Sequence, residues 1–315
     1  MKFKNLKKSD REFIRTTYLQ ADSKSKAQRI LSEAFDVSDR SIRTWTNLLG
    51  ISGDGVTEFE GTRKAKIMIY DIETSRVSAK VWWTGKQYIN HKSLKSEPAI
   101  ISISYKWLGE DTIHAFTWDE NHCDKQLMID FLSVYNEADM LIGQNNDRFD
   151  NRWVNARAMK HNLYVNLNVK SFDIMKQTKR LFRLPSYSMD YITKYLNVEN
   201  KLTHEGMHMW DMIEDGNKSQ QKEYLQKMVD YNVGDIVSTE AMYTRLRKYM
   251  GHKMHIGVLQ GSEAWTSPSD GTKNVTLLKV TTSVAGTLQY IMQSNTDGVT
   301  YKLSNRLYQH YLEQL

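Results

Sequence analysis

The chain has 315 residues, of which 40% are hydrophobic and 25% charged, which is ordinary for a globular protein with one large core and small appendages. We find no apolar run of the roughly 20 residues that a membrane span needs, and no apolar secretion signal after the basic start MKFKNLKKSDR. Cys123 is the single cysteine, which excludes a disulfide framework and a thiolate metal cluster, and we expect a cytoplasmic protein. The net charge of +6 favours a polyanionic partner.

Residues 1–52 are predicted to form a helix-turn-helix domain. Apolar residues recur at helical spacing through KSKAQRILSEAF, and the turn FDVSDRS places Ser38 to cap a second helix. That second helix would present Arg40 and Arg43 to a major groove of DNA. The alternative is a small helical packing module in which the turn is a coincidence, and the helix-turn-helix fold also serves protein partners.

Residues 53–65 are predicted to be a linker, because the surrounding stretch ISGDGVTEFEGTRKAK is polar and contains three glycines. Residues 66–250 then combine strand and helix patterns. IMIYDIE, AIISISYKW, DTIHAFTW and MLIGQN are predicted strands, DKQLMIDFLSVYNEA is a predicted helix, and helices are predicted to dominate after residue 149. Strands followed by helices indicate an α/β core.

Residues 251–315 have a different texture. NVTLLKVTT, TLQYIMQS and GVTYKLSN alternate apolar and polar positions and are separated by turn residues, which predicts a small β-ribbon. A short helix is predicted at LSNRLYQHYLEQL, at the end of this segment.

Carboxylates stand at related places in the predicted core. In YDIET, Asp71 and Glu73 lie two residues apart on a buried strand, so both side chains point to one face of the sheet. Asp150 stands where a strand gives way to a helix, and Tyr231 lies one helical turn before Asp235. Unpaired buried charge is costly, and a divalent cation would offset it. Four acids from three elements form a hard oxygen site of the kind that Mg²⁺ or Mn²⁺ prefers.

Together these residues resemble the DEDDy group of 3′–5′ exonucleases in the DnaQ-like, RNase H-like superfamily. Three motifs carry the resemblance: Asp71 with Glu73, then Asn145 with Phe149 and Asp150, then Tyr231 with Asp235. The stretch LPSYSMDYITKYLNV is similar to the corresponding stretch of exonuclease domains in family B DNA polymerases. The resemblance implies an RNase H-like mixed sheet flanked by helices over residues 66–250. The domain combination is similar to that of stand-alone phage and bacterial exonuclease-like proteins. If this protein is viral, we expect it in the cytoplasm of the host.

The resemblance also implies a two-metal hydrolysis of phosphodiester bonds in DNA. The four acids would hold two Mg²⁺ or Mn²⁺ ions, and Tyr231 would orient the attacking water. Asn145 and Phe149 would hold the terminal nucleotide. In such relatives the C-terminal ribbon binds zinc through cysteine pairs. Residues 251–315 contain no cysteine, so we predict a degenerate zinc-ribbon-like module without zinc.

Other interpretations stay open at this point. The nuclease fold could serve a non-catalytic DNA-binding or scaffold protein, or the same chemistry could act as an endonuclease or an exoribonuclease, since no residue here distinguishes DNA from RNA. HEGMH, residues 204–208, matches the H-E-x-x-H pattern of zinc proteases, but that pattern requires a helix and a loop is predicted. Trp82, Trp83 and Tyr88 lie in a basic insertion and could stack on bases or pack at an edge.

Overall fold

The computed structural model describes residues 6–21, 24–49, 64–198, 206–251 and 254–315. The chain divides into two compact units, Met1–Thr62 and Arg63–Leu315, and each is described by itself. Most of the predicted linker lies outside the described residues. In the described part of the chain, no helix is both long and apolar enough to cross a membrane.

The first unit is helical, with α1 at Lys8–Gln20, α2 at Lys24–Phe35 and α3 at Asp39–Leu48. Ile14, Leu31, Ile42 and Trp45 are buried together in its core, so each helix contributes an apolar side chain. The turn between α2 and α3 is tied by Ser38, whose carbonyl oxygen accepts from the backbone N–H of Ser41 at 2.8 Å. Residues 1–52 therefore contain the expected helices, and their role as a DNA-binding domain stays a prediction.

The second unit is built on a five-stranded mixed sheet with the strand order β5-β4-β1-β6-β7. The central strand β1 (Ile67–Thr74) pairs antiparallel with β4 (Ile100–Trp107) and parallel with β6 (Met140–Gly143). The outer strands are β5 (Ile113–Thr117), antiparallel to β4, and β7 (Lys170–Asp173), parallel to β6. This confirms the predicted α/β fold class, a mixed sheet flanked by helices.

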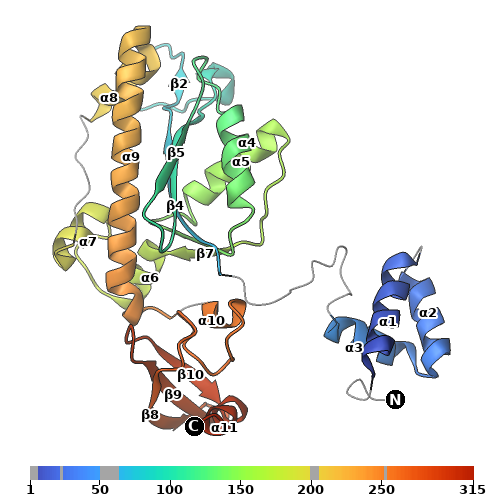
Figure 1. Cartoon of the computed structure of the whole chain (residues 1–315). Coiled ribbons are helices and arrows are strands. Elements are labelled where there is room, and N and C mark those ends of the chain that lie inside the picture. The colour runs from blue at the N-terminus through green and yellow to red at the C-terminus, as the bar shows by residue number, and fades with distance from the viewer. Residues whose placement is uncertain (1–5, 22–23, 50–63, 199–205, 252–253) are drawn as a thin grey trace. The chain divides into compact units, whose positions relative to one another are not determined.

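Helices cover both faces of this sheet (Figure 1). On one face lie α4 (Lys125–Tyr135) and α5 (Asp150–His161), and on the other lies the long helix α9 (Lys218–Leu246). The remaining helices are α6 (Ile174–Leu181), α7 (Met189–Leu196) and α8 (Met207–Asp215), and the 3-10 turn η3 (Arg247–Tyr249) follows α9. Both α7 and α8 pack against α9.

The alternation of side chains along β1 decides which face carries the acids. Met68, Tyr70 and Ile72 pack into the core shared with α4 and α5. Ile67 and Ile69 pack into the core shared with α9. Because successive side chains of a strand point to opposite faces, the odd-numbered set continues as Asp71 and Glu73 on the α9 face.

Two regions of this unit depart from the strand and helix pattern expected from the sequence. After residue 149, where helices were predicted, β7 adds a short parallel strand, of which only Phe172 and Asp173 are buried. Between β1 and β4 the chain forms a small hairpin of β2 (Ser78–Ala79) and β3 (Leu94–Ser96), with the 3-10 turn η2 (His91–Ser93) before β3.

The C-terminal segment forms a separate three-stranded antiparallel sheet at the C-terminal end of α9 (Figure 1). It consists of α10 (Ile256–Leu259), β8 (Val275–Thr282), β9 (Leu288–Ser294), β10 (Thr300–Ser304) and α11 (Asn305–Leu312). Trp265, Tyr290, Met292 and Leu303 are buried in its core. The ribbon and its final helix thus occupy the segments where the alternation predicted them.

Two turns of this C-terminal module have related sequences, SPSDG at residues 267–271 and SNTDG at residues 294–298. Each turn donates a hydroxyl to the aspartate of the other: Ser269 Oγ to Asp297 at 2.6 Å, and Thr296 Oγ1 to Asp270 at 2.8 Å. These reciprocal hydrogen bonds, which we call the turn clasp, join the two turns.

Candidate metal centre

Three of the predicted acids meet on the α9 face of the sheet. One carboxylate oxygen from each of Asp71, Glu73 and Asp235 lies within 4.8 Å of the other two. Asp71 and Glu73 come from β1, and Asp235 comes from the middle of α9, where it is buried. Such closely spaced oxygens are suited to share a cation, because three like charges at this separation repel one another.

The neighbouring strand allows α9 to approach these acids closely. Across the antiparallel pair, Asp71 stands opposite Ser104 and Glu73 stands opposite Ser102. Paired residues project to the same face, and both serines are fully buried with no hydrogen-bond partner for their hydroxyls among the described residues. Small side chains at these two positions leave room for the helix and its carboxylate.

The α9 face also supplies an amide that the sequence did not single out. Asn232 is fully buried, and its Nδ2 donates to Oδ2 of Asp71 at 2.7 Å. This hydrogen bond orients the Asp71 carboxylate. Asn232 lies three residues before Asp235, so one face of α9 serves both acids.

Asp150 begins α5 and lies outside the three-acid group, with 2% of its surface exposed. Its Oδ1 accepts a hydrogen bond of 3.1 Å from the backbone N–H of Ile72, the residue between Asp71 and Glu73. Burial, together with the nearby charges of Asp173 and Asp235, raises the pKa of Asp150 to about 7, against the backbone hydrogen bonds that lower it. Burial and the neighbouring carboxylates therefore disfavour the ionised form of Asp150 when no cation is bound.

A second unexpected residue, Asp173, holds the loop that precedes α5. This buried carboxylate accepts from the backbone N–H groups of Asn145 at 3.1 Å, Asp147 at 3.3 Å and Lys176 at 3.0 Å. Asn145 has a φ of 68°, a left-handed conformation that asparagine tolerates better than most residues. Asp173 thus fixes the backbone of one predicted substrate-binding residue and also caps α6.

The aromatic residues predicted at the site differ in exposure. Phe149, at the N-cap of α5, is 40% exposed, and its ring centroid lies 6.3 Å from that of Trp153. Tyr231 is buried against Ile101, Trp118 and other apolar side chains beneath α8. Its ring is held by packing, one helical turn from Asp235.

Two further sequence predictions concern residues outside this group of acids. Arg40 and Arg43 belong to the first unit, where both are exposed on α3, and Arg43 Nε donates to Gln28 at 3.4 Å. Of the H-E-x-x-H match, His204 and Glu205 lie outside the described residues. His208 is exposed on α8, and its Nε2 lies 3.2 Å from the Tyr224 hydroxyl.

The residues at the centre fit a hard divalent cation. Their donors are three carboxylate oxygens from two elements, and burial raises the pKa of a fourth carboxylate nearby, that of Asp150, as expected where compensating charge is needed. Asn232 and the Ile72 amide orient two of these carboxylates through outer hydrogen bonds. Neither Asn232 nor Asp173 gave a sequence signal beyond its position beside a motif or at the end of a strand.

A comparison with protein families agrees with this architecture. Residues 87–247 match the family model described as the RNase_H superfamily. Among solved structures, the chain is similar to the family B DNA polymerase from the hyperthermophilic archaeon Pyrobaculum calidifontis, with a TM-score of 0.45 and 13% identity. That match covers 62% of this chain and 26% of the polymerase chain, so it spans about a quarter of the polymerase. No curated protein matches the sequence.

Proposed function

This chain belongs to the RNase_H superfamily, and from that membership we propose that it is a metal-dependent 3′–5′ exonuclease of the DEDDy type that hydrolyses DNA. The superfamily indicates a nuclease with a nucleic-acid substrate. The observation that carries the proposal is the meeting of Asp71, Glu73 and Asp235 within 4.8 Å on the face of the sheet that α9 covers.

The four acids have distinct positions in this proposal. Asp71, Glu73 and Asp235 would hold divalent cations directly, and Asp150 would complete the set from the start of α5. Two bound Mg²⁺ or Mn²⁺ ions would stabilise both the attacking and the leaving oxygen of an in-line displacement at phosphorus. Asn232 keeps the Asp71 carboxylate oriented through its 2.7 Å hydrogen bond.

The remaining residues would position the reactants. Tyr231, fixed by its packing under α8, would orient the attacking water through its hydroxyl, a role that depends on placement more than on an altered acidity. The exposed ring of Phe149 would stack on the terminal base, and Asn145, on the loop held by Asp173, would hydrogen-bond to the terminal nucleotide.

We further propose that the first unit is a helix-turn-helix that adds affinity for duplex DNA. Its exposed α3 carries Arg40 and Arg43, while Ile42 and Trp45 of the same helix face the core. A recognition helix requires this division into a buried face and a basic exposed face.

The direct test is a cleavage assay with single-stranded DNA that carries a label at its 5′ end. With Mg²⁺ or Mn²⁺ we expect a ladder that shortens from the 3′ end, and with EDTA we expect intact substrate. Asp71→Asn should abolish the ladder, whereas Asp190→Asn, which removes an exposed carboxylate paired with Lys194 on α7, should leave it unchanged.

Three outcomes would change the proposal. Internal cuts without a 3′ ladder would indicate an endonuclease, and cleavage restricted to RNA would indicate an exoribonuclease. Retained DNA binding without cleavage under any metal condition would indicate the non-catalytic binding protein.

A further inference from the structure

The segment between β1 and β4 exposes a group of aromatic rings. Residues 77–96, which we call the aromatic insertion, include Trp82, Trp83 and Tyr88, with exposed fractions of 95%, 65% and 92%. By contrast, Trp45, Trp118 and Trp265 are buried. Exposed large apolar groups gathered on one segment mark an interaction surface, because isolated exposure is common but clustering is not.

The charge of the aromatic insertion is uniform. It contains four lysines, Lys80, Lys86, Lys92 and Lys95, and no aspartate or glutamate. All four lysines are exposed. Lysine is depleted in the interfaces between proteins, whereas lysine interleaved with exposed aromatic rings is the composition of surfaces that bind single-stranded nucleic acid.

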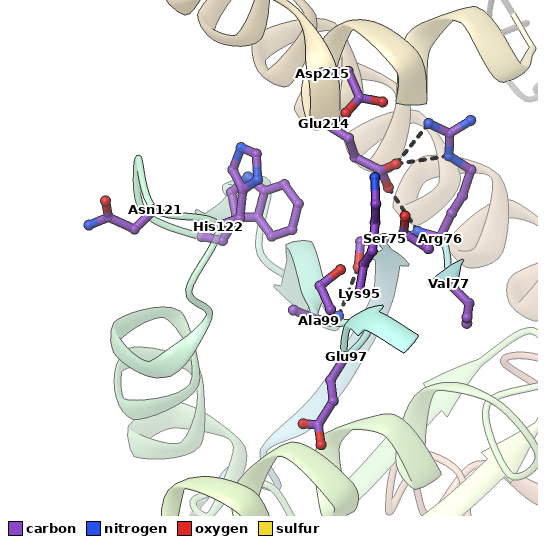
Figure 2. A pocket seen from close by; sticks show the side chains of 13 residues that line it. Ser75, Arg76, Val77, Lys95, Glu97, Ala99, Asn121, His122, Glu214 and Asp215 are labelled. Carbon is purple, nitrogen blue, oxygen red and sulfur yellow. Dashed lines mark hydrogen bonds and ion pairs between the residues drawn. The ribbon is translucent and has the colours of Figure 1, made fainter. Parts of the chain in front are cut away.

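The root of the aromatic insertion is fastened to α8. The Arg76 guanidinium donates to Glu214 at 2.7 and 2.9 Å and to Asp211 at 2.6 Å, as Figure 2 shows for the Glu214 contacts. The Trp210 indole also donates to the carbonyl oxygen of Thr74 at 2.9 Å. Because α8 packs on α9, these bonds fix the root of the insertion relative to the helix that carries Asp235.

Both ends of the aromatic insertion leave the sheet beside Asp71, Glu73 and Asp235, which we call the acid cluster. It begins three residues after Thr74, the residue that follows Glu73 in β1, and it returns into β4, whose Ser102 pairs with Glu73. In Figure 1, β2 lies near α8, at the end of α9 opposite the C-terminal sheet. A strand held on the insertion would therefore approach the acids from the α8 end of the site.

A cavity of about 510 Å³ lies between the insertion and α8, and Figure 2 shows its lining. Its charged lining residues are Arg76 and Lys95 against Glu97, Glu214 and Asp215. The excess of carboxylates disfavours a phosphate chain inside this cavity. Lys80, Lys86 and Lys92 do not line it, so the phosphates are expected on the outer side of the insertion.

We propose that the aromatic insertion binds single-stranded nucleic acid, with bases stacked on Trp82, Trp83 and Tyr88 and phosphates neutralised by the lysines. The assignment of this strand as the substrate of the acid cluster rests on the proposed function. The binding itself does not, because stacking and charge neutralisation need no metal and no cleavage.

The test measures binding in EDTA, where hydrolysis cannot occur, by the fluorescence anisotropy of a labelled single strand of about 16 nucleotides. Trp82→Ala/Trp83→Ala should weaken binding by at least about 10-fold, because each stacked base contributes substantially to affinity. Trp82→Phe/Trp83→Phe should retain most of it, since phenylalanine still stacks. Tyr164→Ala, which removes an exposed aromatic ring outside the insertion, is the matched control and should bind as the unaltered protein does.

Intrinsic fluorescence supplies an independent readout. Bases stacked on the indoles should quench the emission of the unaltered protein, and Trp82→Phe/Trp83→Phe should lose that quenching while still binding. Equal affinities for the alanine variant and the Tyr164→Ala control would overturn the proposal, as would a dimer that the alanine variant converts to a monomer. If binding follows these expectations but the unaltered protein does not cleave DNA, the proposed function fails and the inference about binding stands.

Discussion

The Nδ2 of Asn232 lies 2.7 Å from Oδ2 of Asp71, so a neutral buried amide on α9 restrains a carboxylate on β1. The hydrogen bond joins the two elements that supply the acid cluster. Because the Asn232 side chain is neutral, a substitution there removes this hydrogen bond without changing the charge of the centre.

We expect Asn232→Ala to lower the affinity for Mn²⁺ by about 10- to 100-fold, as is usual when an outer hydrogen bond to a ligand is lost. The Mn²⁺ affinity is measured by a calorimetric titration. The free energy of unfolding is measured separately, without metal. Asn155→Ala, a partly buried asparagine on α5, serves as control. Lower stability with unchanged metal affinity would show that Asn232 only packs.

The stability of the metal-free protein should depend on Asp150. Its pKa is about 7 in the folded protein and near its ordinary value of 3.8 in the unfolded chain, so the folded state binds the proton more tightly. The free energy of unfolding should therefore rise as pH falls from about 7 to about 4, by about 4 kcal/mol from this group. Denaturant unfolding in EDTA at several pH values measures the effect.

Asp150→Asn supplies the matched comparison for that pH series, because asparagine mimics the neutral acid and can still accept from Ile72. This variant should be more stable than the unaltered protein above pH 7 and should show a flatter pH dependence, while losing nuclease activity. Equal slopes for the two proteins would contradict the assignment of the effect to Asp150.

Metal binding should stabilise the second unit through the acid cluster. Mn²⁺ at about 100 times its dissociation constant should add about 2.7 kcal/mol to the free energy of unfolding. Asp235→Asn should remove this increment, since it deletes a charge of the three-acid group. Asp190→Asn should retain it, and thermal unfolding with and without Mn²⁺ compares the three proteins. A full increment in Asp235→Asn would place the ion elsewhere.

The first unit should contribute a salt-dependent share of duplex affinity. Replacing Arg40 and Arg43 together with alanine should weaken duplex binding and reduce the slope of log affinity against log salt by about 1 for each lost phosphate contact. Arg29→Ala, on the exposed side of α2, should leave the slope unchanged. Anisotropy titrations at several salt concentrations supply the slopes, and an unaltered slope in the double variant would favour a protein partner for this unit.

The fold class could be predicted because its main elements have strong periodicity. In β1, the alternation that buries Met68 and Ile69 on opposite faces also fixes where Asp71 and Glu73 point. The strand β7 was missed because it has four residues and buries two of them, which is too little to form a pattern. Its pairing with β6 is a tertiary contact that sequence spacing does not encode.

The supporting residues of the candidate centre were beyond sequence reasoning for a related reason. Asn232 donates one hydrogen bond to Asp71, and Asp173 accepts two from the loop before α5; these partners are distant in the sequence, and no periodicity marks either residue. The burial that raises the pKa of Asp150 likewise arises only when α5 docks against β1. The roles assigned to the acids, Tyr231, Asn145 and Phe149 stay predictions.

The turn clasp of the C-terminal module has a practical consequence for these experiments. Its two turns are closed by hydroxyl and carboxylate groups, Ser269 with Asp297 and Thr296 with Asp270, so their closure needs no thiol and no ion. A chelator that strips the acid cluster should leave this sheet intact. Chelation can therefore serve as a reversible, local perturbation, and any activity restored by returning metal reports on the acids of β1 and α9 and not on refolding of the C-terminal module.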